Sequence, residues 1–131
     1  MRNRFVFALA VMLLTAFSSQ AATIYTGEMF GSSEVPPNAS PATGSITVTI
    51  NGDEMTVSLN WDGLIGGNPA AAHIHCCTAP GSNVGVAVGF TGFPATTSGT
   101  YDHMFNLLDA SIYTAGFLNN FGGGTAAGAR D

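Results

Sequence analysis

Residues 44–61, GSITVTINGDEMTVSLNW, contain two runs in which apolar and polar residues alternate strictly. The apolar members are Ile46, Val48 and Ile50 in the first run and Met55, Val57, Leu59 and Trp61 in the second. Alternation of this kind, in runs rich in β-branched residues, is typical of strands with one buried face. Asn51-Gly52 between the runs tolerates the positive φ that a tight turn needs. The stretch therefore predicts a β-hairpin that forms one wall of the core.

The rest of the chain continues in short extended segments. Further strands are predicted at residues 23–30, 70–77, 84–90 and 99–107. Clusters of Gly, Pro, Ser and Thr separate them, and residues 34–41 form a loop because prolines lack the donor for a strand ladder. This spacing predicts an all-β fold, an antiparallel sandwich or barrel of immunoglobulin-like or superoxide-dismutase-like type. After Asp109 the apolar spacing changes and predicts a short helical segment near the C-terminus.

The composition indicates one folded domain. The chain has 131 residues, of which 46% are hydrophobic and 8% are charged, whereas disordered chains show the opposite balance. The formal net charge is −5, and residues 22–131 carry one Arg against eight carboxylates, a net charge of −7. Such a surface cannot neutralise a row of phosphates and is repelled by anionic lipid headgroups. We therefore expect no nucleic-acid partner.

The N-terminus has the three regions of a secretory signal peptide. Arg2 and Arg4 give a basic start, an apolar run of 13 residues follows at 5–17, and Ser19-Gln20-Ala21 supplies small residues for cleavage. The run is shorter than the roughly 20 residues that span a bilayer, which disfavours an uncleaved anchor. Residues 1–21 are thus predicted to be removed. The domain at 22–131 is expected to be secreted, periplasmic or at the cell surface, without a membrane span.

Residues 73–77, HIHCC, carry most of the ligand chemistry in the chain. On an extended strand, alternate side chains point the same way about 6.6 Å apart, so His73, His75 and Cys77 would share a face. Imidazole and thiolate groups suit copper or zinc better than calcium or magnesium. His103, on a later predicted strand, is a further candidate. The candidate metal ligands are therefore His73, His75, Cys77 and His103.

Structural roles compete with metal binding at this stretch. A His-x-His pair on a sheet is most often structural, with rings hydrogen-bonded to backbone or loop groups. Cys76 and Cys77 are the only two cysteines, and an oxidising compartment favours a vicinal disulfide between them over free thiols, with pairing between chains left open. Copper/zinc superoxide dismutases also contain a His-x-His strand. A dismutase needs a third nitrogen ligand and an open coordination position, so we expect no enzyme.

Four stretches stand in an order that is fairly specific. They are residues 31–38 (GSSEVPPN), 40–44 (SPATG), 71–75 (AAHIH) and 99–103 (GTYDH). Together they resemble the CHRD (chordin) domain family, from about Tyr25 to the C-terminus. The resemblance implies an exported microbial protein of all-β architecture; in animal chordin, similar domains occur in an extracellular growth-factor antagonist. It implies a non-catalytic binding or structural module whose partner is an extracytoplasmic protein or surface component, and no enzyme class.

The end of the chain departs from that family pattern. Members usually continue past the Ala-rich helical stretch into a further strand with an Asn-Ile-His-like segment and a Gly-Glu-Ile-Arg-Gly-like close. This chain stops at Asp131, so we expect the closing strands of the domain to be missing. An unpaired sheet edge left in this way would invite association.

Overall fold

The computed structural model describes residues 21–79 and 81–131, so all but the last residue of the predicted signal peptide lies outside the described residues. The elements, in order, are β1 (Thr23–Phe30), η1 (Gly31–Ser33), β2 (Thr43–Asn51), β3 (Glu54–Asp62), β4 (His73–His75), β5 (Val86–Gly89), β6 (Gly99–Asn106), η2 (Ala110–Ile112), α1 (Ala115–Phe121) and α2 (Ala126–Arg130). The protein is thus mostly β with short C-terminal helices. This confirms the predicted predominance of β-strands and the predicted short helical segment near the C-terminus.

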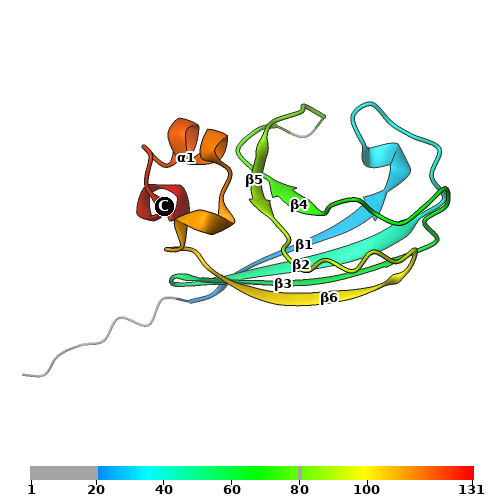
Figure 1. Ribbon diagram of the computed structural model, residues 1–131, viewed down its shortest axis with the longest axis horizontal. Coiled ribbons are helices and arrows are strands. Elements are labelled where there is room, and N and C mark those ends of the chain that lie inside the picture. The colour runs from blue at the N-terminus through cyan, green and yellow to red at the C-terminus, as the bar shows by residue number, and fades with distance from the viewer. Residues whose placement is uncertain (1–20, 80) are drawn as a thin grey trace, which may run out of the picture.

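The strands form two antiparallel sheets. One has four strands in the order β1-β2-β3-β6, and the other pairs β4 with β5. Figure 1 shows the small sheet lying over one face of the large sheet, with α1 and the C-terminus beside it. Within the described ranges the sheets do not close into a barrel. No helix in those ranges is long and apolar enough to cross a membrane.

The hairpin predicted from residues 44–61 is confirmed. Strands β2 and β3 pair from Thr43 opposite Asp62 to Asn51 opposite Glu54, and Gly52 in the turn has a φ of 59°. The predicted apolar side of β3 is buried, at Met55, Val57, Leu59 and Trp61. The polar residues between them are exposed. Because one face meets the core and the other meets solvent, the alternating pattern translates directly into packing.

The strands around the His-x-His stretch are shorter than predicted. Strand β4 contains only His73–His75, and its pairing with β5 shifts between Ile74 and His75. Cys77 has a φ of 75°, a left-handed conformation that interrupts an extended chain. The predicted strand over 70–77 was therefore too long. Alternation of side chains beyond His75, which would have placed Cys77 beside the two histidines, is lost.

Aromatic side chains fill the space between the sheets. The Phe90 ring centroid lies 5.4 Å from that of Tyr101 and 6.0 Å from that of Phe105, within the range of favourable aromatic pairs. The Tyr101 hydroxyl donates to the Thr91 carbonyl at 2.9 Å. Burial raises the pKa of Tyr101, because the phenolate would lose hydration. The two sheets are thus joined by one aromatic core.

Trp61 closes one end of this core. Its indole Nε1 donates to the Thr96 carbonyl at 3.0 Å, and its ring stacks on Phe93 with centroids 4.6 Å apart. A Cβ at Gly99, the residue opposite Trp61 on β6, would lie 3.0 and 3.1 Å from two indole carbons. Gly99 thus leaves the space that the six-membered ring of the indole occupies.

The C-terminal segment is attached to the small sheet through backbone bonds. Tyr113 forms an isolated bridge with Val88, and the Thr114 amide donates to the Ala87 carbonyl at 3.0 Å. The Thr114 hydroxyl accepts from the Phe117 amide at 3.2 Å and so caps α1. The helices therefore flank the core without covering the opposite end of the sheets.

Candidate functional site

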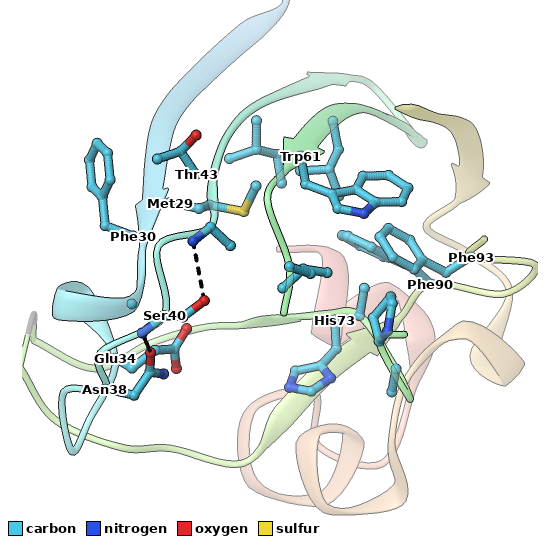
Figure 2. Close-up of a pocket in the computed structure, with 18 of the residues that line it drawn as sticks. Met29, Phe30, Glu34, Asn38, Ser40, Thr43, Trp61, His73, Phe90 and Phe93 are labelled. Carbon is cyan, nitrogen blue, oxygen red and sulfur yellow. Dashed lines mark hydrogen bonds between the residues drawn. The ribbon is translucent and has the colours of Figure 1, made fainter. Parts of the chain in front are cut away.

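A partly open cavity of about 460 Å³ lies at the end of the core that contains Trp61. Its walls are mostly apolar and include Met29, Ile46, Leu59, Trp61, Leu64, Phe90 and Phe93. Its polar lining residues are Glu34, Asn38, Ser40, Thr43, His73 and His75. Figure 2 shows Glu34, Asn38 and Ser40 on one side and His73 on the other. The cavity thus has an apolar interior with few polar groups.

The loop on one side of the cavity is held by local hydrogen bonds. The Asn38 amide donates to the Gly31 carbonyl at 2.9 Å, and the Asn38 side-chain oxygen accepts from the Ser40 amide at 2.9 Å. The Ser40 hydroxyl accepts from the Ala42 amide at 3.2 Å. A Cβ at Gly31 would lie 2.3 Å from the Asn38 oxygen, so Gly31 permits this close approach. These bonds fix the loop that carries Glu34.

His73 and His75 lie together on the opposite side. Their ring centroids are 4.7 Å apart in an edge-on arrangement. His75 Nδ1 lies 2.6 Å from the Val84 carbonyl oxygen. Because a carbonyl only accepts, Nδ1 must donate, and a neutral His75 ring keeps its lone pair on Nε2.

Burial lowers the pKa of His73, and the nearby His75 lowers it further. The Glu34 carboxylate acts in the opposite direction. The pKa of His73 is therefore below the ordinary imidazole value, and its ring stays neutral to a lower pH.

His103 lies apart from that pair on β6. Its ring centroid is 5.7 Å from Tyr101 and 4.5 Å from Phe105 on the core-facing side of the strand. It lines a second cavity, of about 600 Å³, to which His73 also contributes. The first cavity does not include His103. The carboxylate of the neighbouring Asp102 accepts a hydrogen bond from the Ser58 hydroxyl. Asp102 and His103 therefore point to opposite faces of the strand.

The two cysteines are bonded to each other. Cys76 and Cys77 form a disulfide with an S–S distance of 2.07 Å, so neither sulfur is a thiolate ligand in this state. In the part of the chain that the structure describes, no three His, Cys, Asp or Glu side chains form a group that could hold a metal ion. The structure thus brings His73 and His75 together but does not assemble them with Cys77 and His103.

Two parts of the site were missed in the sequence. The sequence pattern predicts a loop around Glu34 but no role for its side chain, and it predicts a buried strand face at Trp61 but no cavity beside it. The stretch 31–38 carried a signal, because it was the first of the four stretches that indicated the family. The position of Glu34 across the cavity from His73 depends on contacts between distant segments, which the sequence pattern does not specify.

Comparison with known protein families identifies a CHRD domain in this chain. The model of the CHRD domain matches residues 25–126, which include the hairpin, the Glu34 loop and the His73–His75 strand. No curated protein and no solved structure matches the chain. The family match covers most of the sequence, and the chain therefore belongs to the CHRD domain family.

Proposed function

We propose that this protein is a non-catalytic extracytoplasmic binding module that holds a small, largely apolar ligand in the cavity beside Trp61. The observation that carries the proposal is the cavity itself, with about 460 Å³ of space and predominantly apolar walls. Ligand sites in proteins are typically concave, about 300–1,000 Å³ in volume, and lined by apolar and aromatic side chains with a few polar groups. The cavity meets each of these conditions.

The polar lining supports binding rather than a reaction. The side-chain oxygens of Asn38 and Ser40 accept backbone N–H groups of their own loop, and His75 Nδ1 donates to a backbone carbonyl. These contacts hold the opening in one shape. The driving force for binding would then be the removal of apolar ligand surface from water, which contributes about 25 cal/mol per Å².

Intrinsic fluorescence gives a direct test, because Trp61 is the single tryptophan of the chain and lines the cavity. We expect 1-octanol to change the Trp61 emission in a saturable way. Ala72→Phe should abolish the response, because Ala72 lines the cavity and the added ring occupies it.

Ala70→Phe is the matched control, since Ala70 is exposed and is not among the lining residues. Circular dichroism would show whether each variant keeps its fold. An equal, saturable octanol response in Ala72→Phe would place the ligand elsewhere and contradict the proposal.

Export of the protein is a separate part of the proposal. The basic start, apolar run and small residues of positions 1–21 support a cleaved signal peptide. We expect the intact mass of protein from its native host to correspond to a chain that begins at Ala22 or Thr23. A full-length mass in the membrane fraction would contradict cleavage.

A second candidate function is copper or zinc binding by His73 and His75. The observation that favours it is the His75 Nδ1 bond to the Val84 carbonyl, because such a bond fixes the tautomer and orientation of a ligating imidazole. For the architecture, we propose a sandwich of immunoglobulin-like or superoxide-dismutase-like type, because the two antiparallel sheets face each other. The two imidazoles would leave the remaining coordination positions to water.

Calorimetric titration with Cu²⁺ and Zn²⁺ tests the second candidate. His73→Ala and His75→Ala should each abolish the binding heat, whereas His103→Ala should leave it unchanged because, among the described residues, His103 forms no metal-binding group with the pair. Affinity should fall as the pH is lowered, because protons compete with the metal for the imidazole nitrogens; since the pKa of His73 is lowered, protonation of His73 sets in below the ordinary imidazole value. If binding is no tighter than about 1 mM, equivalent to about −4 kcal/mol, both histidines are structural.

A further inference from the structure

We propose that the ligand of this cavity is a small organic cation, an amine or quaternary ammonium group on an apolar body. This inference rests on the proposed function and adds the chemical class of the ligand. The charge of the lining carries it. Among the described residues that line the cavity, Glu34 is the one Asp, Glu, Lys or Arg side chain, so the lining offers a negative charge and no permanent positive charge.

The cation of the domain lies elsewhere. Arg130 is the sole Lys or Arg among residues 22–131, and in the structure it pairs with Asp53 and Asp131. Neither carboxylate lines the cavity. A ligand carboxylate or phosphate would therefore meet Glu34 without a compensating Arg or Lys. The net charge of −7 on residues 22–131 attracts cations to the protein and repels anions.

The walls suit the same class of ligand. The Trp61 and Phe93 rings stack 4.6 Å apart, and Phe90 lies 6.4 Å from Phe93. Because Trp61 stacks on Phe93, these rings offer apolar surface that packs against the chain of such a ligand. The indole N–H of Trp61 is already donated to the Thr96 carbonyl. It is therefore not available as a donor for an anionic ligand.

His73 and His75 reinforce the preference for a cation when their rings are neutral. His75 donates its Nδ1 hydrogen to Val84, so its neutral ring presents an acceptor at Nε2. His73 lies beside it, with the two ring centroids 4.7 Å apart. A ligand N–H⁺ group would thus meet the Glu34 carboxylate and an imidazole lone pair, and charge-assisted hydrogen bonds of this kind are among the stronger ones.

Three probes with the same apolar chain test the inference: octylammonium, 1-octanol and octanoate. Each is titrated at pH 8 and low ionic strength, below its micelle-forming concentration, with Trp61 emission as the signal. At this pH the amine is protonated and the carboxylate is ionised. We expect octylammonium to bind at least about tenfold more tightly than octanoate, a difference of about 1.4 kcal/mol, with octanol between them.

Glu34→Gln should remove most of the preference for octylammonium and leave the affinity for octanol unchanged. Glu28→Gln is the matched control, because Glu28 is an exposed carboxylate on β1 that does not line the cavity. It should keep the preference of the unmodified protein.

The outcomes separate this inference from the proposed function. If octanol binds in the cavity but octylammonium binds no more tightly than octanoate, the cationic class is wrong and the binding module stands. If Glu34→Gln leaves the preference intact, the preference does not arise from the charge of this cavity, and the inference fails while the binding module stands. If none of the three probes changes the Trp61 emission, both the inference and the proposed function are overturned.

Discussion

Phe105→Ala is expected to lower the free energy of unfolding by about 3–5 kcal/mol, the usual cost of removing a buried aromatic side chain. Phe105 is 3% exposed and its ring packs against Phe90 and His103. Because β6 pairs with only β3 among the described strands, side-chain packing supplies much of the free energy that holds β6 in the sheet. Urea unfolding followed by circular dichroism measures the loss.

Met104→Ala is the matched control for this prediction. Met104 precedes Phe105 on the same strand, faces the opposite side and is 60% exposed. Its truncation should change the free energy of unfolding by less than about 1 kcal/mol. Equal losses in the two variants would mean that β6 does not bury the Phe105 side, and the assignment of the core-facing side of this strand would be wrong.

The hairpin could be predicted because its information is local. Alternation specifies which side of each strand is buried, and Asn51-Gly52 specifies where the chain reverses. Strand β1 was likewise predicted with its observed bounds, 23–30. In these segments the pattern and the tertiary structure demand the same conformation, so propensity and packing agree.

The site was harder to predict because it is not local. The positions of Glu34, Trp61 and His73 in one cavity depend on how the 31–42 loop and the small sheet cover the large sheet. The alternating pattern does not indicate that Cys77 takes a left-handed conformation. Because it does, the expected shared face of His73, His75 and Cys77 is not formed. The candidate ligands were chosen by residue type, and whether such residues converge depends on tertiary contacts that the local sequence does not specify.

His103 is another residue whose surroundings could not be predicted from the local sequence. Its register, opposite Val57 on β3, places it between Tyr101 and Phe105 on the core-facing side. Pairing of β3 with β6 joins segments that are separated by more than thirty residues of chain. Register between distant strands is set by packing over the whole sheet, and the sequence around His103 alone does not contain it.

Gly44 is a second position where a substitution should strongly lower stability, although the alternating sequence pattern does not reveal it. Gly44→Ala is expected to lower the free energy of unfolding by about 2–3 kcal/mol, because overpacking of a filled site forces backbone or side chains apart. A Cβ at Gly44 would lie 2.4 Å from the Asn60 carbonyl oxygen and 2.5 Å from the Met29 methyl carbon. Met29 can rotate, but the Asn60 carbonyl belongs to the β3 backbone and cannot move without disturbing the sheet.

Gly27→Ala on the neighbouring strand is the matched control. A Cβ there would meet its nearest atom, a methyl carbon of Ile46, at 3.5 Å, an ordinary contact. Gly27 does not have a positive φ, so alanine should be neutral or should stabilise by up to about 1 kcal/mol through the unfolded state. Urea unfolding of both variants measures the difference, and equal stabilities would contradict the observed register of Gly44 opposite Trp61.

The same substitution links the packing of the sheet to the proposed site. Gly44 lies opposite Trp61 and against Met29, and both of those side chains line the cavity. An alanine at this position should therefore change the Trp61 emission of the folded protein and weaken its response to octanol. Gly27→Ala should leave both signals unchanged. If Gly44→Ala is destabilised but binds octanol as the unmodified protein does, the probe does not occupy the Met29–Trp61 end of the cavity.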